Sequence, residues 1–222
     1  MSYQFDFLAV AREAPELAAG LARTVELTAV ACIAGLLIGI VGAVCRAWQL
    51  RPFNTLFAVY VEMFRNTPFL VQLFFLFFGL PTLGIDIAPD SAAMLAMVIN
   101  LGAYAVEIIR SGIEATPKGQ IEAAQALALK RWQIFLHVVL RPALLRVWPA
   151  MTSQVVIVML GSAVCAQIST EELSYAASLI QSRNFRAFET YFVTAGLYLA
   201  LALLLRQALL RGGGRLLKRG RP

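Results

Sequence analysis

The chain has 222 residues, of which 59% are hydrophobic and only 14% are charged. Soluble domains are apolar at about half of their positions, so this composition excludes a soluble domain and indicates an integral membrane protein. The formal net charge is +6, but the basic residues stand at the edges of apolar runs. That distribution is typical of membrane topology and not of a nucleic-acid-binding surface.

Five apolar runs predict an all-α polytopic membrane protein that forms a single domain over residues 1–222, because each span uses about 20 residues and a connection. The predicted spans are residues 21–45, 55–80, 91–110, 147–164 and 188–210, counted approximately. The N-terminal residues lack the features of a cleaved signal peptide, so we expect them to be retained. The three cysteines have no metal spacing and are expected to be buried without a disulfide. They are Cys32, Cys45 and Cys165.

Charged residues between the runs predict the orientation. Arg46 and Arg51 follow the first run, whereas the connection after the second carries only Asp86 and Asp90. The C-terminal tail has five basic residues and no acid: Arg211, Arg215, Lys218, Arg219 and Arg221. The positive-inside rule therefore places the N-terminus outside and the C-terminus in the cytoplasm.

The second run is interrupted by the sequence RNTP, which comprises Arg65, Asn66, Thr67 and Pro68. A charged residue about ten positions into an apolar run is costly unless it faces protein or water, and the proline frees a backbone carbonyl that another group must bond. One reading is a kinked helix that lines a path or anchors a gate. The other is an arginine that extends to the cytoplasmic headgroups from a tilted helix. Glu62 is the predicted helical partner of Arg65.

The third run has a polar face formed by Asn100, Tyr104 and Glu107. Asn100 and Glu107 are seven residues apart and so share a side of the helix, where they make either a buried helix–helix contact or a substrate contact. The candidate gate or pathway residues are therefore Glu62, Arg65, Thr67, Pro68, Gln72, Asn100 and Glu107.

A polar, alanine-rich segment over residues 116–133 separates the third and fourth runs, and its basic residues place it in the cytoplasm. Thr116 is the predicted N-cap of a helix that has Pro117 at its first position. Glu122 lies near the positive end of that helix, and the alanines leave a face that another protein can approach closely. The alternative is an exposed amphipathic loop helix without a partner.

The fourth span is expected to begin near Val147, after the prolines and arginines that follow the cytoplasmic segment. His137 precedes that start and has no residue spaced to share a metal, so we expect it at the surface. The polar residues 167–187 predict a short outer helix capped by Ser169 or Thr170.

A search for catalytic motifs finds no phosphate-binding loop, no HExxH and no GxSxG. We therefore expect neither an enzyme nor a metal or cofactor site in this chain. Five helices are also too few to enclose a wide pathway, so transport of a solute would need a second copy or a homologue.

Two blocks of the chain resemble a known family. GQIEAAQALALKRWQIFLHVVL, preceded by AVEIIRSGIEATPK, is similar to the EAA loop of permease subunits of type I ABC importers. YVEMFRNTPFLVQLFFLFFGLP resembles a block of the polar amino-acid uptake branch of that family. The similarity covers residues 17–210.

The resemblance implies a permease subunit in a bacterial plasma membrane that imports a polar amino acid. A separate ATPase dimer would bind ATP and Mg²⁺, a second permease would complete the pathway, and an extracytoplasmic binding protein would deliver the substrate to residues 81–91 and 165–187. The residues implied in coupling to the ATPase are Gly119, Gln120, Glu122, Ala123, Ala124 and Ala128.

Three departures from the family pattern limit how far the roles of the family's residues can be assigned to this chain. Ala128 stands where the family usually has glycine, and alanine adopts a left-handed bend less readily than glycine does. Pro142 is displaced by one position, and LGSAV at Leu160–Val164 replaces KDTSL or QDTSL. We therefore expect a heterodimer in which a different permease keeps the charged residues.

Alternatives to a polar amino-acid importer stay open from the sequence. An ion-coupled carrier or channel would place acidic residues deep in several spans, and here only Glu62 and Glu107 are candidates. A membrane scaffold would need no kinked second helix. Within the importer reading, opines and other small zwitterions remain alternative substrates.

Overall fold

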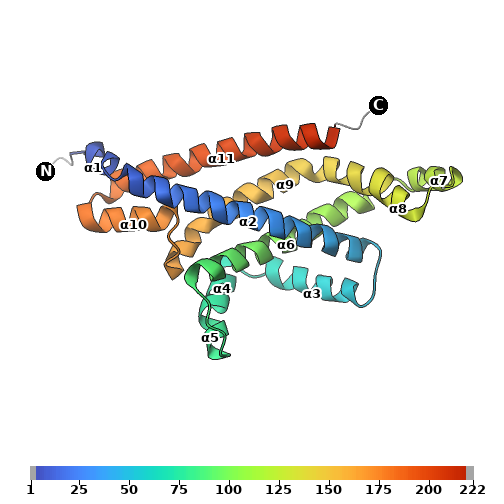
Figure 1. The fold of residues 1–222 in the computed structure, drawn as a ribbon, viewed down its shortest axis with the longest axis horizontal. Helices are drawn as coiled ribbons and strands as arrows, with labels where there is room; N and C mark the ends of the chain where they lie inside the picture. Colours follow the sequence, from blue (N-terminus) through green and yellow to red (C-terminus); the bar gives the residue numbers. More distant parts are fainter. Residues whose placement is uncertain (1–3, 219–222) are drawn as a thin grey trace.

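A computed structural model describes residues 4–218, which fold into helices joined by short turns. Four helices run along the length of the molecule (Figure 1): α2 (Ala14–Ala47), α6 (Pro89–Glu114), α9 (Arg141–Gly161) and α11 (Ala187–Lys218). Within the described residues, four helical segments are long and apolar enough to cross a membrane, or five if one bent pair counts as a span. The prediction of an all-α polytopic protein is confirmed.

The two ends of the bundle carry different elements (Figure 1). The N-terminal helix α1 (Phe7–Ala11) and helix α10 (Leu173–Asn184) lie at one end. Helices α7 (Lys118–Ala126) and α8 (Arg131–Gln133) lie at the other. Arg219 and Arg221, part of the basic tail that predicts a cytoplasmic C-terminus, lie outside the described residues.

The helix that contains the fourth predicted span begins before Val147. Helical structure runs without interruption from Arg131 to Ile168. It comprises α8, a π-helical segment (Ile134–Leu140), α9 and a 3-10 segment (Ser162–Ile168). Pro142 does not break this run because it stands in the first turn of α9 and follows the π-helical segment, whose wider turn accommodates the irregularity.

The second predicted span is broken instead of kinked. Helix α3 (Phe53–Arg65) ends at the RNTP sequence, and the chain resumes 110° away as α4 (Phe69–Phe74). A π-helical segment (Phe75–Gly79) and α5 (Leu80–Thr82) continue in that direction, away from the bundle (Figure 1).

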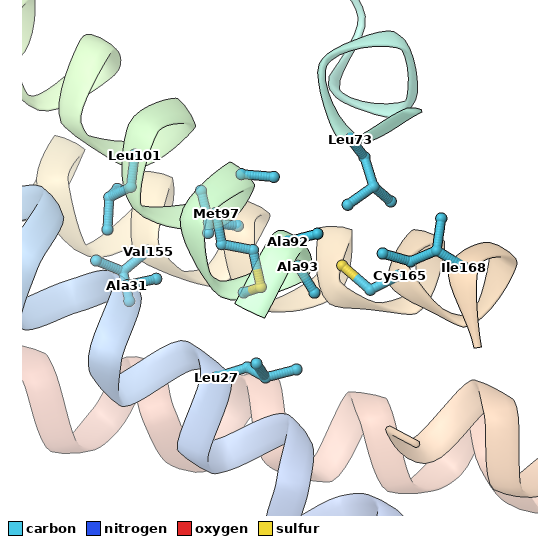
Figure 2. Close-up of a cluster of buried hydrophobic side chains, with 12 residues drawn as sticks. Leu27, Ala31, Leu73, Ala92, Ala93, Met97, Leu101, Val155, Cys165 and Ile168 are labelled. Carbon is cyan, nitrogen blue, oxygen red and sulfur yellow. The ribbon is translucent and has the colours of Figure 1, made fainter. Parts of the chain in front are cut away.

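Helix α4 is anchored by Leu73, which is fully buried. Its side chain points toward a cluster that includes Ala92 of α6 and Cys165 and Ile168 of the 3-10 segment (Figure 2). The break therefore has a fixed place in the core of the bundle.

Close packing joins α2 to α6. A methyl group added at Gly39 would collide with Ala105, and one added at Gly42 would lie 2.5 Å from a side-chain carbon of Val106. Glycine at these positions lets the two backbones approach, as small residues do at helix interfaces in lipid. The residues of α6 are consequently the most buried of any long helix in the described structure, with 61% of its most apolar window inside.

Two local predictions need correction. Glu172, not Ser169 or Thr170, caps α10, because its side chain accepts a hydrogen bond of 2.9 Å from the backbone N–H of Tyr175. Ser169 instead has a left-handed backbone with φ of 63°. Of the three cysteines, all free, only Cys165 is buried, whereas the two on α2 are half-buried. His137 is exposed, as predicted.

Candidate functional site

Side-chain hydrogen bonds hold the break between α3 and α4. Gln72 Nε2 donates to the carbonyl oxygen of Phe64 at 2.8 Å, and to the carbonyl oxygen and Oγ1 of Thr67 at 2.9 Å each. Thr67 Oγ1 donates in turn to the carbonyl oxygen of Met63 at 2.7 Å. Pro68 has no N–H to offer Phe64, four residues earlier. The free carbonyl expected from the sequence is therefore bonded by Gln72.

A second amide ties this arrangement to α6. Asn100 Nδ2 donates to Gln72 Oε1 at 3.0 Å. Gln72 is 6% exposed and Asn100 is 8% exposed. Buried amides are stable in an apolar environment only when they are hydrogen-bonded. Asn100 thus makes a helix–helix contact that fixes the angle of the break.

A polar recess of about 210 Å³ lies beside the break, lined by Val61, Glu62, Arg65, Asn66 and Tyr104. The predicted ion pair between Glu62 and Arg65 is wrong. Glu62 Oε2 accepts a hydrogen bond of 2.8 Å from Asn66 Nδ2. The Arg65 guanidinium lies over the Tyr104 ring, 5.4 Å from its centroid. The reason is that α3 ends at Arg65, so its side chain extends across to α6.

Glu107 shares a face of α6 with Asn100 but joins a different neighbour. Arg46 Nη1 of α2 donates to Glu107 Oε2 at 3.0 Å. Arg110, on the next turn of α6, also pairs with Glu107 and with Glu114. This network lies at the end of the bundle that carries α7, where it connects α2 and α6. It does not line the recess at the break.

The segment between α6 and α8 forms the predicted helix, but its start is different. Pro117 precedes the helix in an extended conformation, with φ of −60° and ψ of 133°, and Lys118 is the first helical residue. Thr116 does not cap it, and its buried hydroxyl has no hydrogen-bond partner among the described residues. The cap prediction is therefore wrong.

Helix α7 presents one face to the bundle and another to solvent. Ala124 is 5% exposed and packs in a cluster with Ile134, with Ile121 against it. The remaining predicted coupling residues of the helix are exposed: Gly119, Gln120, Glu122 and Ala123. Ala124 therefore anchors the helix to its own chain and is not part of the free face.

Leu127 ends this helix and is 76% exposed. The sequence analysis did not single it out, although an apolar residue that follows an exposed polar helix is a signal for a partner contact. The next residue, Ala128, has a left-handed backbone with φ of 56°. A left-handed bend is thus present with alanine, which costs about 1–2 kcal/mol relative to a right-handed residue.

Comparison with known proteins matches these features to a family. Residues 35–212 match the model described as the binding-protein-dependent transport system inner membrane component. The chain belongs to this family. This permease is 34% identical to the glutamine transport system permease GlnP of Escherichia coli (strain K12), over 91% of its own length and 93% of that protein. It is 33% identical to the arginine transport system permease ArtQ of Bacillus subtilis (strain 168), over 90% and 92% of the two chains.

Solved structures agree with the sequence matches. The permease superposes with a TM-score of 0.87 on a chain from the crystal structure of an amino acid ABC transporter with histidines, at 32% identity over 96% of this chain and all of that one. The MetNI methionine ABC transporter in an inward-facing conformation gives a TM-score of 0.71 at 21% identity, which shows a shared fold. The resemblance to amino-acid permeases of type I importers is confirmed, and family membership decides against a carrier or a scaffold.

Proposed function

We propose that this chain is the membrane-spanning subunit of an ATP-driven importer of a polar amino acid in the bacterial inner membrane. The observation that carries the proposal is helix α7, which leaves Glu122 and Ala123 in solvent at one end of the bundle. The substrate class is supported by the relatives, which are named as permeases of glutamine and arginine transport systems.

Helix α7 is proposed to dock in a cleft of a cytoplasmic ATPase dimer that binds ATP and Mg²⁺. The small side chain of Ala123 permits close approach, Glu122 offers a carboxylate for a basic partner, and Leu127 offers an apolar anchor. Ala124 packs with Ile134, so a displacement of α7 is passed to the helical run that leads into α9. The docked helix thus acts as a lever on the permease.

The opposite end of the bundle is proposed to face the extracytoplasmic binding protein through residues 81–91 and 165–187. Figure 1 supports this orientation, because α10 and the N-terminus lie at the end away from α7. The proposed arrangement has the N-terminus outside and the C-terminus in the cytoplasm.

We further propose that the second permease is a different chain. A recess of about 140 Å³ between α4, α6 and α9 has no charged residue in its lining and only one polar one, Asn100. Its other residues are Phe69, Ile157, Val158, Gly161 and Val164. The substituted LGSAV segment contributes two of these residues, so charged groups would come from the partner. Native mass spectrometry that finds two copies of this chain and no second permease would contradict the heterodimer.

The main test is ATP hydrolysis by the co-purified complex in lipid, with the binding protein and a panel of amino acids, opines and other small zwitterions. Stimulation by one compound names the substrate. Glu122→Lys should release the ATPase and lower the stimulated rate at least tenfold, because a like charge replaces the complementary one. Glu171→Lys is the control for ATPase co-purification alone: Glu171 is exposed at the end of the bundle away from α7, so this variant should still co-purify with the ATPase. An ATPase that never co-purifies with the native chain would refute the proposal.

A further inference from the structure

The recess at the break holds two opposite charges deep in the apolar part of the chain. Helix α3 extends for 13 residues from Phe53 to Arg65, a rise of about 20 Å. Phe53 follows the arginine-bearing connection predicted to be cytoplasmic, so Arg65 lies about two thirds of the way across a hydrocarbon core of about 30 Å. Glu62 and Arg65 are both exposed in the single chain. Charges at such depth must face protein or a water-filled cavity.

These two charges have unused hydrogen-bonding capacity. Arg46 and Arg110 form close ion pairs with Glu107, whereas Arg65 interacts with Glu107 only through a longer-range electrostatic attraction and has its guanidinium over Tyr104. A guanidinium has five N–H donors, and stacking over Tyr104 uses none of them. Glu62 accepts one hydrogen bond from Asn66, which leaves further lone pairs free.

We propose that this recess is a transit site for the zwitterionic head of an amino acid on its way to the cytoplasm. Arg65 binds the α-carboxylate through its N–H fork, and Glu62 binds the α-ammonium group. This inference rests on the proposed import function and assigns that function a binding site in this chain.

The size and surroundings of the recess fit this occupant. Its volume of about 210 Å³ is below the range of about 300–1,000 Å³ that accommodates drug-sized ligands. The recess has room for the head group of an amino acid, and its open side leaves space for the side chain. The site therefore recognises what all amino acids share and leaves side-chain selection to other parts of the transporter.

A second recess lies next to this one along α6. Asn100 borders the recess of about 140 Å³ described above. Tyr104, one helical turn closer to the α7 end, borders the charged recess. The hydrogen bond between Gln72 and Asn100 stands at this junction. A solute that follows this face of α6 would leave an apolar chamber and enter a charged one.

The test measures binding of radiolabelled L-arginine, L-glutamine and agmatine to the assembled, nucleotide-free complex in nanodiscs without binding protein. Agmatine is arginine without its carboxylate. Arg65→Met should weaken L-arginine and L-glutamine binding at least tenfold and abolish the preference for L-arginine over agmatine, while Arg65→Lys should retain part of that preference. Glu62→Gln should weaken both amino acids about tenfold. Arg51→Met removes an exposed arginine outside the recess and should leave binding unchanged.

Several outcomes would overturn the site. One is an intact complex with Arg65→Met that still prefers L-arginine over agmatine. Another is dissociation of the Arg65→Met complex into subunits, which would make Arg65 a contact between permeases. Uptake assays on the native complex separate these results from failure of the import function. A native complex that takes up no amino acid would overturn the proposed function and this inference with it.

Discussion

Two of the breaks in helical structure, one between α3 and α4 and one between α7 and α8, satisfy their backbone hydrogen bonds in different ways. At the break between α3 and α4, side chains supply the missing hydrogen bonds, with Gln72 alone donating to three acceptors. At the turn between α7 and α8, backbone groups suffice: the N–H of Ala128 donates to the carbonyl of Gln125 at 2.9 Å, and the N–H of Leu129 donates to that of Ala124 at 3.2 Å.

The difference follows from the surroundings of each segment. Water satisfies any backbone group left over at the exposed turn, so its sequence has to provide only the right backbone angles. At the break, the hydrogen bond between Asn100 and Gln72 is buried and the bond from Gln72 to the Phe64 carbonyl is partly buried, so these groups need partners within the protein although the residues of the RNTP sequence are exposed. The break therefore depends on specific side chains, and the turn depends on one left-handed residue.

The largest expected effect comes from removing the side chain that holds the break. Gln72→Leu leaves the carbonyls of Phe64 and Thr67 and the amide of Asn100 without their partner. Thr67 is exposed, so water can bond its carbonyl, whereas Phe64 is half-buried and Asn100 is buried. Two unsatisfied groups at about 1–3 kcal/mol each predict a loss of about 2–6 kcal/mol in the free energy of unfolding. Thermal or denaturant unfolding of the purified permease in detergent would measure it.

The exposed turn offers a matched control for that substitution. Gln125→Leu makes the same chemical change on the solvent side of α7, where Gln125 is exposed. We expect a change within about 0.5 kcal/mol. Equal losses at the two positions would show that the contrast between the break and the turn is mistaken.

A smaller effect of opposite sign is expected at the turn. Ala128→Gly relieves the strain of a left-handed alanine with φ of 56°, but it adds flexibility to the unfolded chain. The net result should be a gain of about 0.5–1 kcal/mol in the free energy of unfolding. Ala126→Gly, two residues earlier in the last turn of α7, should instead lose up to about 1 kcal/mol. The same unfolding assay compares the two variants. A lower free energy of unfolding in both would show that the backbone at Ala128 is not strained.

The third and smallest effect concerns Glu172 in the connection before α10, a buried side chain that bonds backbone groups in a segment outside the long helices. Burial raises the pKa of Glu172 above its ordinary value, although hydrogen bonds from Tyr198 and the backbone of α10 oppose the shift. The folded state therefore holds a proton that the unfolded state releases, and stability falls as the pH rises above about 4.5. Glu172→Gln should flatten this dependence in melting temperatures measured against pH, and the exposed Glu171→Gln should not. A steeper fall in Glu172→Gln would reverse the assigned sign.

Much of the fold was predictable because hydropathy marks apolar spans whatever their packing. The missed boundaries have specific causes. Pro142 and Pro149 suggested an interruption, but one stands in a first turn and the other lies within a continuous helix. The extent of the break was missed because the bond from Gln72 to Phe64 spans eight residues, a relation that helical spacing does not reveal.

The sequence predicted which residues form the candidate site better than it predicted which of them contact one another. Glu62 and Arg65 were expected to pair at helical spacing, yet the helix ends at Arg65 and the guanidinium turns to Tyr104. The alanine-rich helix was placed correctly, but sequence alone could not show that Ala124 faces inward. Its orientation depends on contacts with Ile134, which follows the bend at Ala128.

The glycines of α2 have a consequence for motion. Gly39 brings α2 close to the backbone of Ala105, and Gly42 lies against the side chains of Val106 and Phe57, so a relative movement of α2 and α6 would disrupt close packing between them. Any alternation between outward and inward openings must therefore carry α2 and α6 as one rigid body. The flexing would fall to the connections around that body, above all to residues 66–68, where the helix is already divided.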